Sequence, residues 1–210
     1  MKNATKHAEG LKSLLKKMLK EHKPPPRQTM EPLKALVRGA MSFDVPDARA
    51  DEAMKLIDRE FVDLNELRVA TDLEIQELLG TRYPAIERRV AMITLSLNHI
   101  FEKEHTLSLE RLKGVSKRDA RQFLRELPEA HPFVEAYVML YGFDAPAVPM
   151  DDDLLSFLQQ QEIVTEETSL EEAQRFVEHH LKGEECYSFH VLSRRIGRVD
   201  NGRPKKKAKA

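Results

Sequence analysis

The sequence predicts an all-α protein, and three features indicate this fold class. Apolar residues recur at intervals of three and four, the spacing of one helix face, and no segment alternates convincingly with a period of two. Thr71 with Glu74 three residues later is the pattern of a capping box, which begins a helix. The connections are short and carry Gly or Pro, as at Gly80, Pro128 and Pro146. We therefore expect about nine or ten helices joined by tight turns.

The first helix is expected to be amphipathic and to dock on a part of the protein far along the sequence. Leucine and methionine recur at helical spacing, at Leu11, Leu14, Leu15, Met18 and Leu19. The helix must end before the prolines at 24–26, because proline cannot continue a helix. Its lysine-rich opposite face leaves a membrane-surface or partner helix as the alternative. Further helices are expected at 32–41, 48–61, 63–79, 86–104, 108–113, 117–127, 132–141, 154–161, 169–181 and 186–196.

Length and composition indicate a protein that folds around its own core. The chain has 210 residues, of which 41% are hydrophobic and 33% charged, and it contains no apolar run of membrane-spanning length. The lysine-rich start is unlike a secretory signal, so we expect a cytoplasmic protein, associated with the nucleoid if it binds DNA. The single cysteine, Cys186, can form neither an internal disulfide nor a four-thiolate iron-sulfur site. We therefore expect no cofactor.

Charge is distributed unevenly along the chain, although the formal net charge is -1. Acidic residues dominate the middle and residues 151–185, so overall charge does not attract nucleic acid. The segment after Arg198 has little to bury and is expected to be a disordered, solvated tail, with phosphate binding as the alternative. The basic residues crowd the two ends: Lys2, Lys6, Lys12, Lys16, Lys17, Lys20 and Lys23 at the start, and Arg203, Lys205, Lys206, Lys207 and Lys209 at the finish.

Several segments match one known family in order and spacing. They are Phe61-Val-Asp-Leu-Asn-Glu-Leu-Arg-Val69, the two helices at 107–112 and 116–127, and Tyr137-Val-Met-Leu-Tyr-Gly-Phe-Asp-Ala-Pro-Ala-Val-Pro-Met-Asp151. Over roughly 32–198 the chain resembles the endonuclease III family of base-excision DNA glycosylases. The resemblance implies a two-lobed helix-hairpin-helix glycosylase fold, with a helical barrel lobe at 32–148, a second helical lobe from 1–31 and 149–198, a disordered basic tail at 199–210, and Asp151 in the cleft.

The hairpin of the resembling family has two candidate positions. Counting back from Asp151 places it at Leu127-Pro-Glu-Ala-His-Pro-Phe133, where the family reads Leu-Pro-Gly-Val-Gly-x-Lys. In this register Glu129 and His131 replace glycines that present backbone N-H groups to a DNA phosphate, and Phe133 replaces the nucleophilic lysine. The alternative is Leu112-Lys-Gly-Val-Ser-Lys117, with an insertion before the aspartate. In the first register, lyase activity is not expected unless Lys113, Lys117 or Arg118 substitutes.

Asp151 matches the family's catalytic aspartate, which stabilises a positively charged sugar and activates water. The Thr-His that normally follows is replaced by Asp152 and Asp153, and three adjacent carboxylates repel DNA. The alternative for Asp151 is the cap of the next helix. Asp44 occupies the neighbourhood of the family's amide side chain that fills the gap left by a flipped base, which weakens base flipping.

Two functional hypotheses follow from the sequence. The first is an endonuclease III-like DNA-binding protein of base-excision repair, at best a monofunctional glycosylase using Asp151, acting as a monomer on duplex and possibly damaged DNA. The second is a catalytically inactive scaffold or partner-binding module. A zinc site at His179, His180, Cys186 and His190 is disfavoured by their irregular spacing, so no metal is expected. The candidate DNA contacts are Lys113, Lys117, Arg118, His131, Lys205, Lys206 and Lys207.

Overall fold

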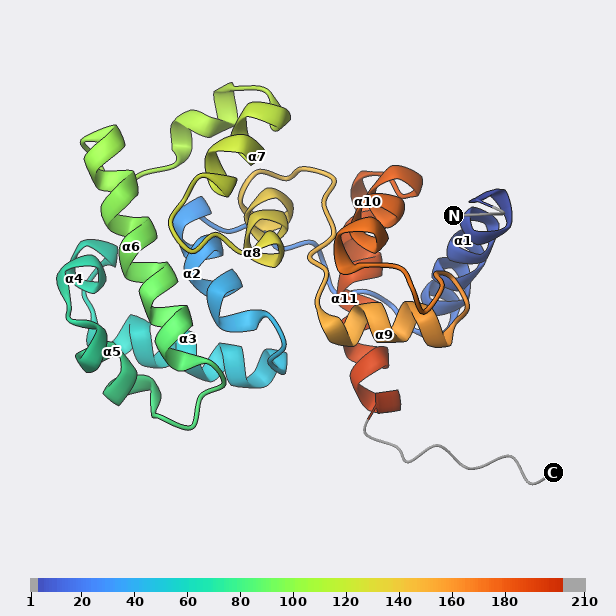
Figure 1. Ribbon diagram of the computed structural model, residues 1–210, viewed down its shortest axis with the longest axis horizontal. Helices are drawn as coiled ribbons and strands as arrows, with labels where there is room; N and C mark the ends of the chain where they lie inside the picture. Colours follow the sequence, from blue (N-terminus) through green and yellow to red (C-terminus); the bar gives the residue numbers. More distant parts are fainter. Residues whose placement is uncertain (1–3, 202–210) are drawn as a thin grey trace. The chain divides into compact units, whose positions relative to one another are not determined.

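The computed structural model describes the backbone of residues 4–201 and the side chains of residues 5–196, and this part of the chain is helical without a strand. None of its helices is long and apolar enough to cross a membrane. The predicted all-α class is therefore confirmed. In order, the elements are α1 (Ala4–Glu21), α2 (Pro32–Ser42), α3 (Asp47–Glu60), α4 (Leu64–Val69), α5 (Asp72–Leu79), α6 (Ile86–Glu104), the 3-10 helix η1 (Glu110–Gly114), α7 (Lys117–Arg125), α8 (Pro132–Tyr137), the π-helix η2 (Val138–Gly142), α9 (Asp152–Gln160), α10 (Leu170–His180) and α11 (Gly183–Asn201) (Figure 1).

The chain divides into two compact units. The central unit comprises Gln28–Ala145, and the terminal unit is built from both chain ends, up to Arg27 and from Pro146 onward. The terminal unit therefore depends on packing between segments that are more than a hundred residues apart in the sequence.

Helix α2 forms the middle of the central unit. Nine of its eleven residues are buried, and it packs against α3, α6, α8 and η2. Its start is fixed locally, because Pro32 suits the first helical turn and the Glu31 carboxylate accepts hydrogen bonds from the backbone N-H groups of Leu33 (3.0 Å) and Lys34 (2.9 Å). Helices α4 and α5 pack on α6 (Figure 1).

Local capping explains where the expected helix at 63–79 is interrupted. The capping box predicted at Thr71 and Glu74 is present: the Thr71 Oγ1 accepts from the Glu74 N-H, and the Glu74 carboxylate accepts from the Thr71 N-H (2.8 Å). This box begins α5 at Asp72, and the extended backbone of Ala70 and Thr71 separates it from the end of α4 at Val69. The hydrogen bond from the Thr71 backbone lowers the pKa of the Glu74 carboxyl.

In the terminal unit, α1 packs on α10 and α11, while α11 also packs on α9 (Figure 1). Leu11, Leu15 and Met18 are buried, as expected from the docking of an amphipathic helix, whereas Leu19 is 43% exposed. Helix α11 continues to Asn201, so the expectations that it ends at 196 and that a disordered tail starts at 199 were wrong. The remaining tail, with Lys205, Lys206 and Lys207, lies outside the described residues.

Candidate functional site

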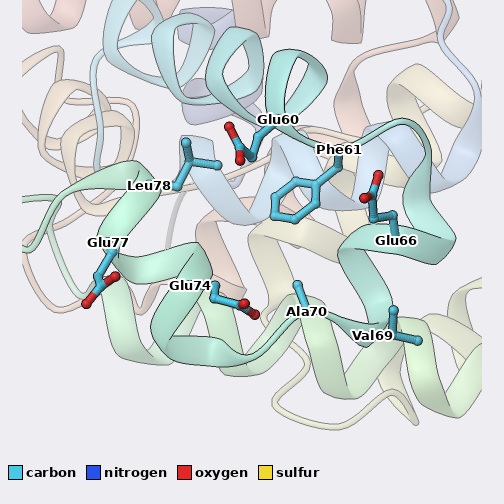
Figure 2. A pocket seen from close by; sticks show the side chains of 8 residues that line it. All are labelled: Glu60, Phe61, Glu66, Val69, Ala70, Glu74, Glu77 and Leu78. Carbon is cyan, nitrogen blue, oxygen red and sulfur yellow. The ribbon is translucent and has the colours of Figure 1, made fainter.

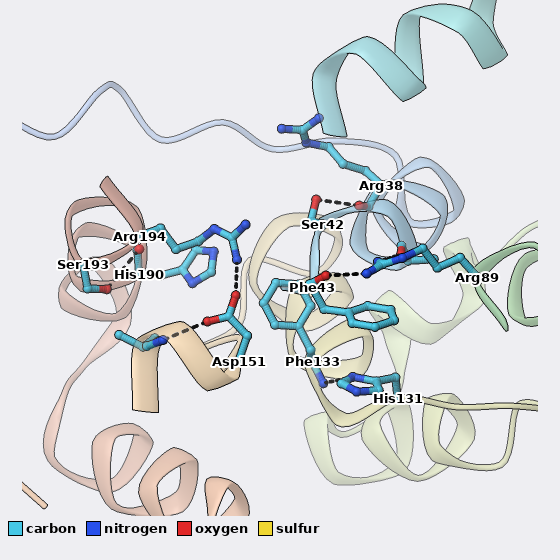
Figure 3. A network of polar contacts seen from close by, with 12 residues as sticks. Arg38, Ser42, Phe43, Arg89, His131, Phe133, Asp151, His190, Ser193 and Arg194 are labelled. Carbon is cyan, nitrogen blue, oxygen red and sulfur yellow. Dashed lines mark hydrogen bonds and ion pairs between the residues drawn. The ribbon is translucent and has the colours of Figure 1, made fainter. Parts of the chain in front are cut away.

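Asp151 is a buried residue at the start of α9. Its extended backbone (φ -121°, ψ 175°) makes it the N-cap, and its Oδ1 accepts a hydrogen bond from the Leu154 N-H at 3.0 Å. Its Oδ2 accepts a hydrogen bond from Arg194 Nη1 at 2.7 Å (Figure 3). The Asp151 side chain is 1% exposed and that of Arg194 is 3% exposed. The two groups therefore form an ion pair inside the terminal unit.

This arrangement limits the chemistry open to the carboxylate. A group that stabilises a developing sugar cation must point its negative charge at the sugar, in a site from which bulk water is excluded. Both Asp151 oxygens are instead engaged by donors of its own unit, the Leu154 amide and the Arg194 guanidinium. Asp152, the next residue, is exposed in the first turn of α9, where its negative charge interacts favourably with the helix dipole.

The segment between α7 and α8 forms a turn that requires a left-handed residue. Glu129, at the position of the family's first hairpin glycine in the expected register, has φ 55°. His131 is the N-cap of α8: its Nδ1 accepts from the Phe133 N-H at 3.2 Å, and its ring stacks on Phe43 with centroids 4.3 Å apart (Figure 3). The side chain of His131 thus has a structural role in the turn.

Replacing Glu129 by glycine is expected to raise the free energy of unfolding by about 0.5–1 kcal/mol. A left-handed conformation disfavours a residue with a Cβ by about 1–2 kcal/mol, and the greater unfolded-state entropy of glycine offsets about half of that gain. Urea denaturation measures the difference, with Ala130→Gly in the same turn as the control. A loss of stability in Glu129→Gly equal to that in Ala130→Gly would contradict the assigned strain.

Phe133, at the position of the family's nucleophilic lysine in the same register, is a core residue. It is fully buried, and its ring lies 5.9 Å from that of Tyr137 and 6.3 Å from that of Phe43. A phenyl ring carries no amine that could attack a sugar. This position therefore contributes packing to the central unit.

Two arginines of α7 are held by a carboxylate of α8. Glu135 is buried, and its oxygens lie 2.8 Å from Arg125 Nε and 3.2 Å from Arg121 Nη1. The Glu135 carboxylate thus offsets part of the guanidinium charge within the central unit. Periodicity alone did not identify this interaction, although an acidic residue within the apolar run 133–141 was a signal for it.

The other basic residues of this region are exposed. Lys113, Lys117 and Arg118 all lie on the surface, and Lys113 pairs with Glu110 at 2.7 Å. Lys117 and Arg118 form the first turn of α7, whose N-cap Ser116 accepts a hydrogen bond from the Asp119 N-H at 3.1 Å. Three of the predicted DNA contacts thus gather around the start of α7.

The turn after α2 is clamped by a buried arginine that the sequence did not single out. Arg89 is 1% exposed and donates to the carbonyl oxygens of Pro84 (2.7 Å), Ala40 (2.6 Å) and Phe43 (2.7 Å), while its guanidinium lies 3.7 Å from the centre of the Phe43 ring (Figure 3). Burial lowers the pKa of Arg89 to about 10. Its position on the apolar face of α6 was the available signal. Asp44, in the same turn, is exposed with φ 52°.

An acidic groove lies between the end of α3 and helices α4 and α5. It has a volume of about 590 Å³, and Phe61 projects into it among glutamates (Figure 2). No lysine or arginine of the described residues lines it, so it is a poor surface for phosphates. Its lining residues are Glu60, Phe61, Glu66, Val69, Ala70, Glu74, Glu77 and Leu78.

The histidines and the cysteine near the end of the chain do not form a metal site. In the described part of the chain, no three His, Cys, Asp or Glu side chains are arranged around a common point. His180 Nδ1 lies 2.8 Å from the Phe176 carbonyl oxygen, and the ring of His179 packs edge-on against that of His180. Cys186 is buried.

Comparison with known proteins places this fold in a defined class. No protein-family model and no curated protein sequence matches the chain. Among solved structures, an endonuclease III trapped covalently on DNA is similar with a TM-score of 0.74 and 15% identity, covering 91% of this chain and 86% of that one. The 8-oxoguanine glycosylase/lyase of Clostridium acetobutylicum, in complex with double-stranded DNA, gives 0.73 and 16% identity, covering 95% and 71%. The 3-methyladenine DNA glycosylase MagIII of H. pylori, bound to 1,N6-ethenoadenine, gives 0.68 and 13% identity, covering 96% and 99%.

The class is the all-helical fold that these similar structures share. More particularly, the chain has the fold of the helix-hairpin-helix DNA glycosylases, and the resemblance noted in the sequence is confirmed at the level of the fold. Sequence identities of 13–16% establish nothing finer than the fold.

Proposed function

We propose that this chain is a DNA-binding protein of the glycosylase fold that holds duplex DNA without excising a base. The observation that carries the proposal is the engagement of both Asp151 oxygens, by Leu154 at 3.0 Å and by Arg194 at 2.7 Å, in a side chain that is 1% exposed. Releasing the carboxylate toward a substrate would break its ion pair with the buried Arg194 guanidinium, which is strongly unfavourable.

Strand cleavage by a lysine at the family's position is also not expected. Phe133 has no amine, and the nearby Glu129 places a carboxylate at the turn where a phosphate would lie. Phe133 thus supports the loss of the lyase step, and Glu129 supports a weakened phosphate contact at the hairpin.

Exposed cations at the start of α7 support duplex DNA as the partner. Lys117 and Arg118 lie in the first turn of a nine-residue helix, where backbone N-H groups and the helix dipole also favour an anion. The similar endonuclease III and C. acetobutylicum enzymes were both solved with DNA. The rival function, a monofunctional glycosylase using Asp151, predicts lesion-dependent binding and base release.

The test is the affinity of the full chain for a labelled duplex containing an abasic-site analogue, beside an undamaged duplex, at two salt concentrations. We expect equal affinity for both duplexes within about twofold, and a steep salt dependence. Replacing Lys117 and Arg118 by glutamine should reduce the slope of log K against log salt by about 1–2, because each neutralised phosphate contributes about 0.9.

The matched control is Lys55→Gln with Arg59→Gln, which removes one exposed lysine and one exposed arginine from α3. Absence of duplex binding by the unaltered chain would contradict the proposal and favour the scaffold hypothesis. A marked preference for the abasic duplex would favour the glycosylase instead.

A further inference from the structure

The outer face of α1 is a stripe of lysines without acidic partners. Lys12, Lys16 and Lys20 follow one another at intervals of four, with Lys17 beside them, and all four are exposed. Within the described residues none of them forms an ion pair, and Glu9 and Glu21 are the acidic residues of the helix. Like charges at this spacing repel one another, so the stripe is unfavourable to the isolated fold.

The opposite face of α1 is already occupied. Leu11 is fully buried, Leu15 is 4% exposed and Met18 is 3% exposed, since α1 packs on α10 and α11 (Figure 1). A helix that binds a membrane surface must insert its apolar face among the lipids. Because α1 has buried that face in the protein, its exposed side, which carries the lysine stripe together with the partly exposed Leu19, remains available to a partner.

We infer that the stripe of Lys12, Lys16, Lys17 and Lys20 binds the phosphate backbone of duplex DNA. Lys12 and Lys20 are eight residues apart, which is about 12 Å along a helix, and a duplex carries one phosphate charge per about 1.7 Å of its axis, so several phosphates face a stripe of this length. Such a contact depends on the charge and spacing of the phosphates and not on the base sequence. It rests on the proposed function and adds a DNA contact from the terminal unit to that of α7 in the central unit.

The experiment compares the full chain with the variant Lys12→Gln, Lys16→Gln and Lys20→Gln for binding to the undamaged duplex over a range of salt concentrations. The inference predicts a slope of log K against log salt that is shallower by about 2–3, and an affinity at least tenfold lower at about 50 mM salt. The control variant replaces three exposed cations of the central unit, Lys55, Arg59 and Arg88, by glutamine and should change neither quantity by as much as half. The thermal midpoint of the free triple α1 variant should equal or exceed that of the unaltered chain, because like-charge repulsion is removed.

Lysine acetylation with and without duplex provides a site-resolved second readout. Protection of Lys12, Lys16 and Lys20 by DNA is the expected result. Binding that depends on Lys117 and Arg118 but leaves the α1 lysines unprotected would overturn this inference alone, whereas no binding at all would overturn the proposed function with it. Binding to anionic phospholipid vesicles that requires the α1 lysines, with DNA affinity unchanged in the triple variant, would assign the stripe to a lipid surface and overturn the inference.

Discussion

Asp151→Asn is expected to lower the free energy of unfolding by about 3–5 kcal/mol. Asparagine caps a helix nearly as well as aspartate, so the cap to Leu154 is retained and the substitution isolates the ion pair. What is lost is the ion pair with Arg194, whose side chain is 3% exposed, and breaking a buried ion pair by removing one member costs about that much. Urea denaturation followed by circular dichroism measures the change.

The control is Asp152→Asn, which alters an exposed carboxylate one residue later in the same helix turn. It should cost about 0.3–1 kcal/mol, the usual contribution of a charge near a helix N-terminus. Equal stability of Asp151→Asn and the unaltered chain would contradict the structural role of the pair. It would then favour a carboxylate retained for catalysis.

Phe133→Lys, which restores the family's lysine in the expected register, is expected to destabilise the protein by about 4–5 kcal/mol more than Phe133→Met does at pH 7. The site is fully buried and aromatic, so the lysine amine must lose its proton to occupy it. Deprotonating an amine with an ordinary pKa of about 10.4 at pH 7 costs about 1.4 kcal/mol for each unit between the pKa and the pH. Because the folded-state pKa is depressed, the deficit should shrink as the pH rises from 7 toward 10.

Phe133→Met is the matched control, since methionine has a similar length without the charge. It should cost about 1–2 kcal/mol, independent of pH over the same range. Two results together would contradict a core position for Phe133. The Phe133→Lys protein would be as stable as Phe133→Met, and borohydride would trap its amine on an abasic-site duplex. Those results would show that the position still faces a DNA site.

The sequence predicted well those features that depend on neighbouring residues. The Thr71 capping box, the cap at Asp151 and the buried face of α1 are set by short-range hydrogen bonds or by periodicity, and each is found in the structure. The family resemblance also led to the correct fold, because it rested on several segments whose order and spacing matched along much of the chain.

The interactions that decide the chemistry were not visible in the sequence. Arg194 lies 43 residues from Asp151, and no local pattern pairs them. Glu135 and Arg89 occupy positions on apolar helix faces. That pattern indicates a buried charge, but it does not identify the residue that pairs with the charge. The end of α11 was misplaced because a run that becomes more polar after Ile196 was interpreted as the end of the helix, whereas α11 continues to Asn201.

The most direct test of DNA binding without base excision is a single-turnover excision assay. The full chain, in excess, would be incubated with duplexes carrying 8-oxoguanine or 1,N6-ethenoadenine, the altered bases named for the similar glycosylases. Abasic product would be detected after alkaline cleavage. An Asp151 carboxylate held by Arg194 predicts no product above the protein-free background for any duplex, under conditions where binding is saturated. Release of a base that disappears in Asp151→Asn but persists in Asp152→Asn would contradict this prediction and identify the chain as a working glycosylase.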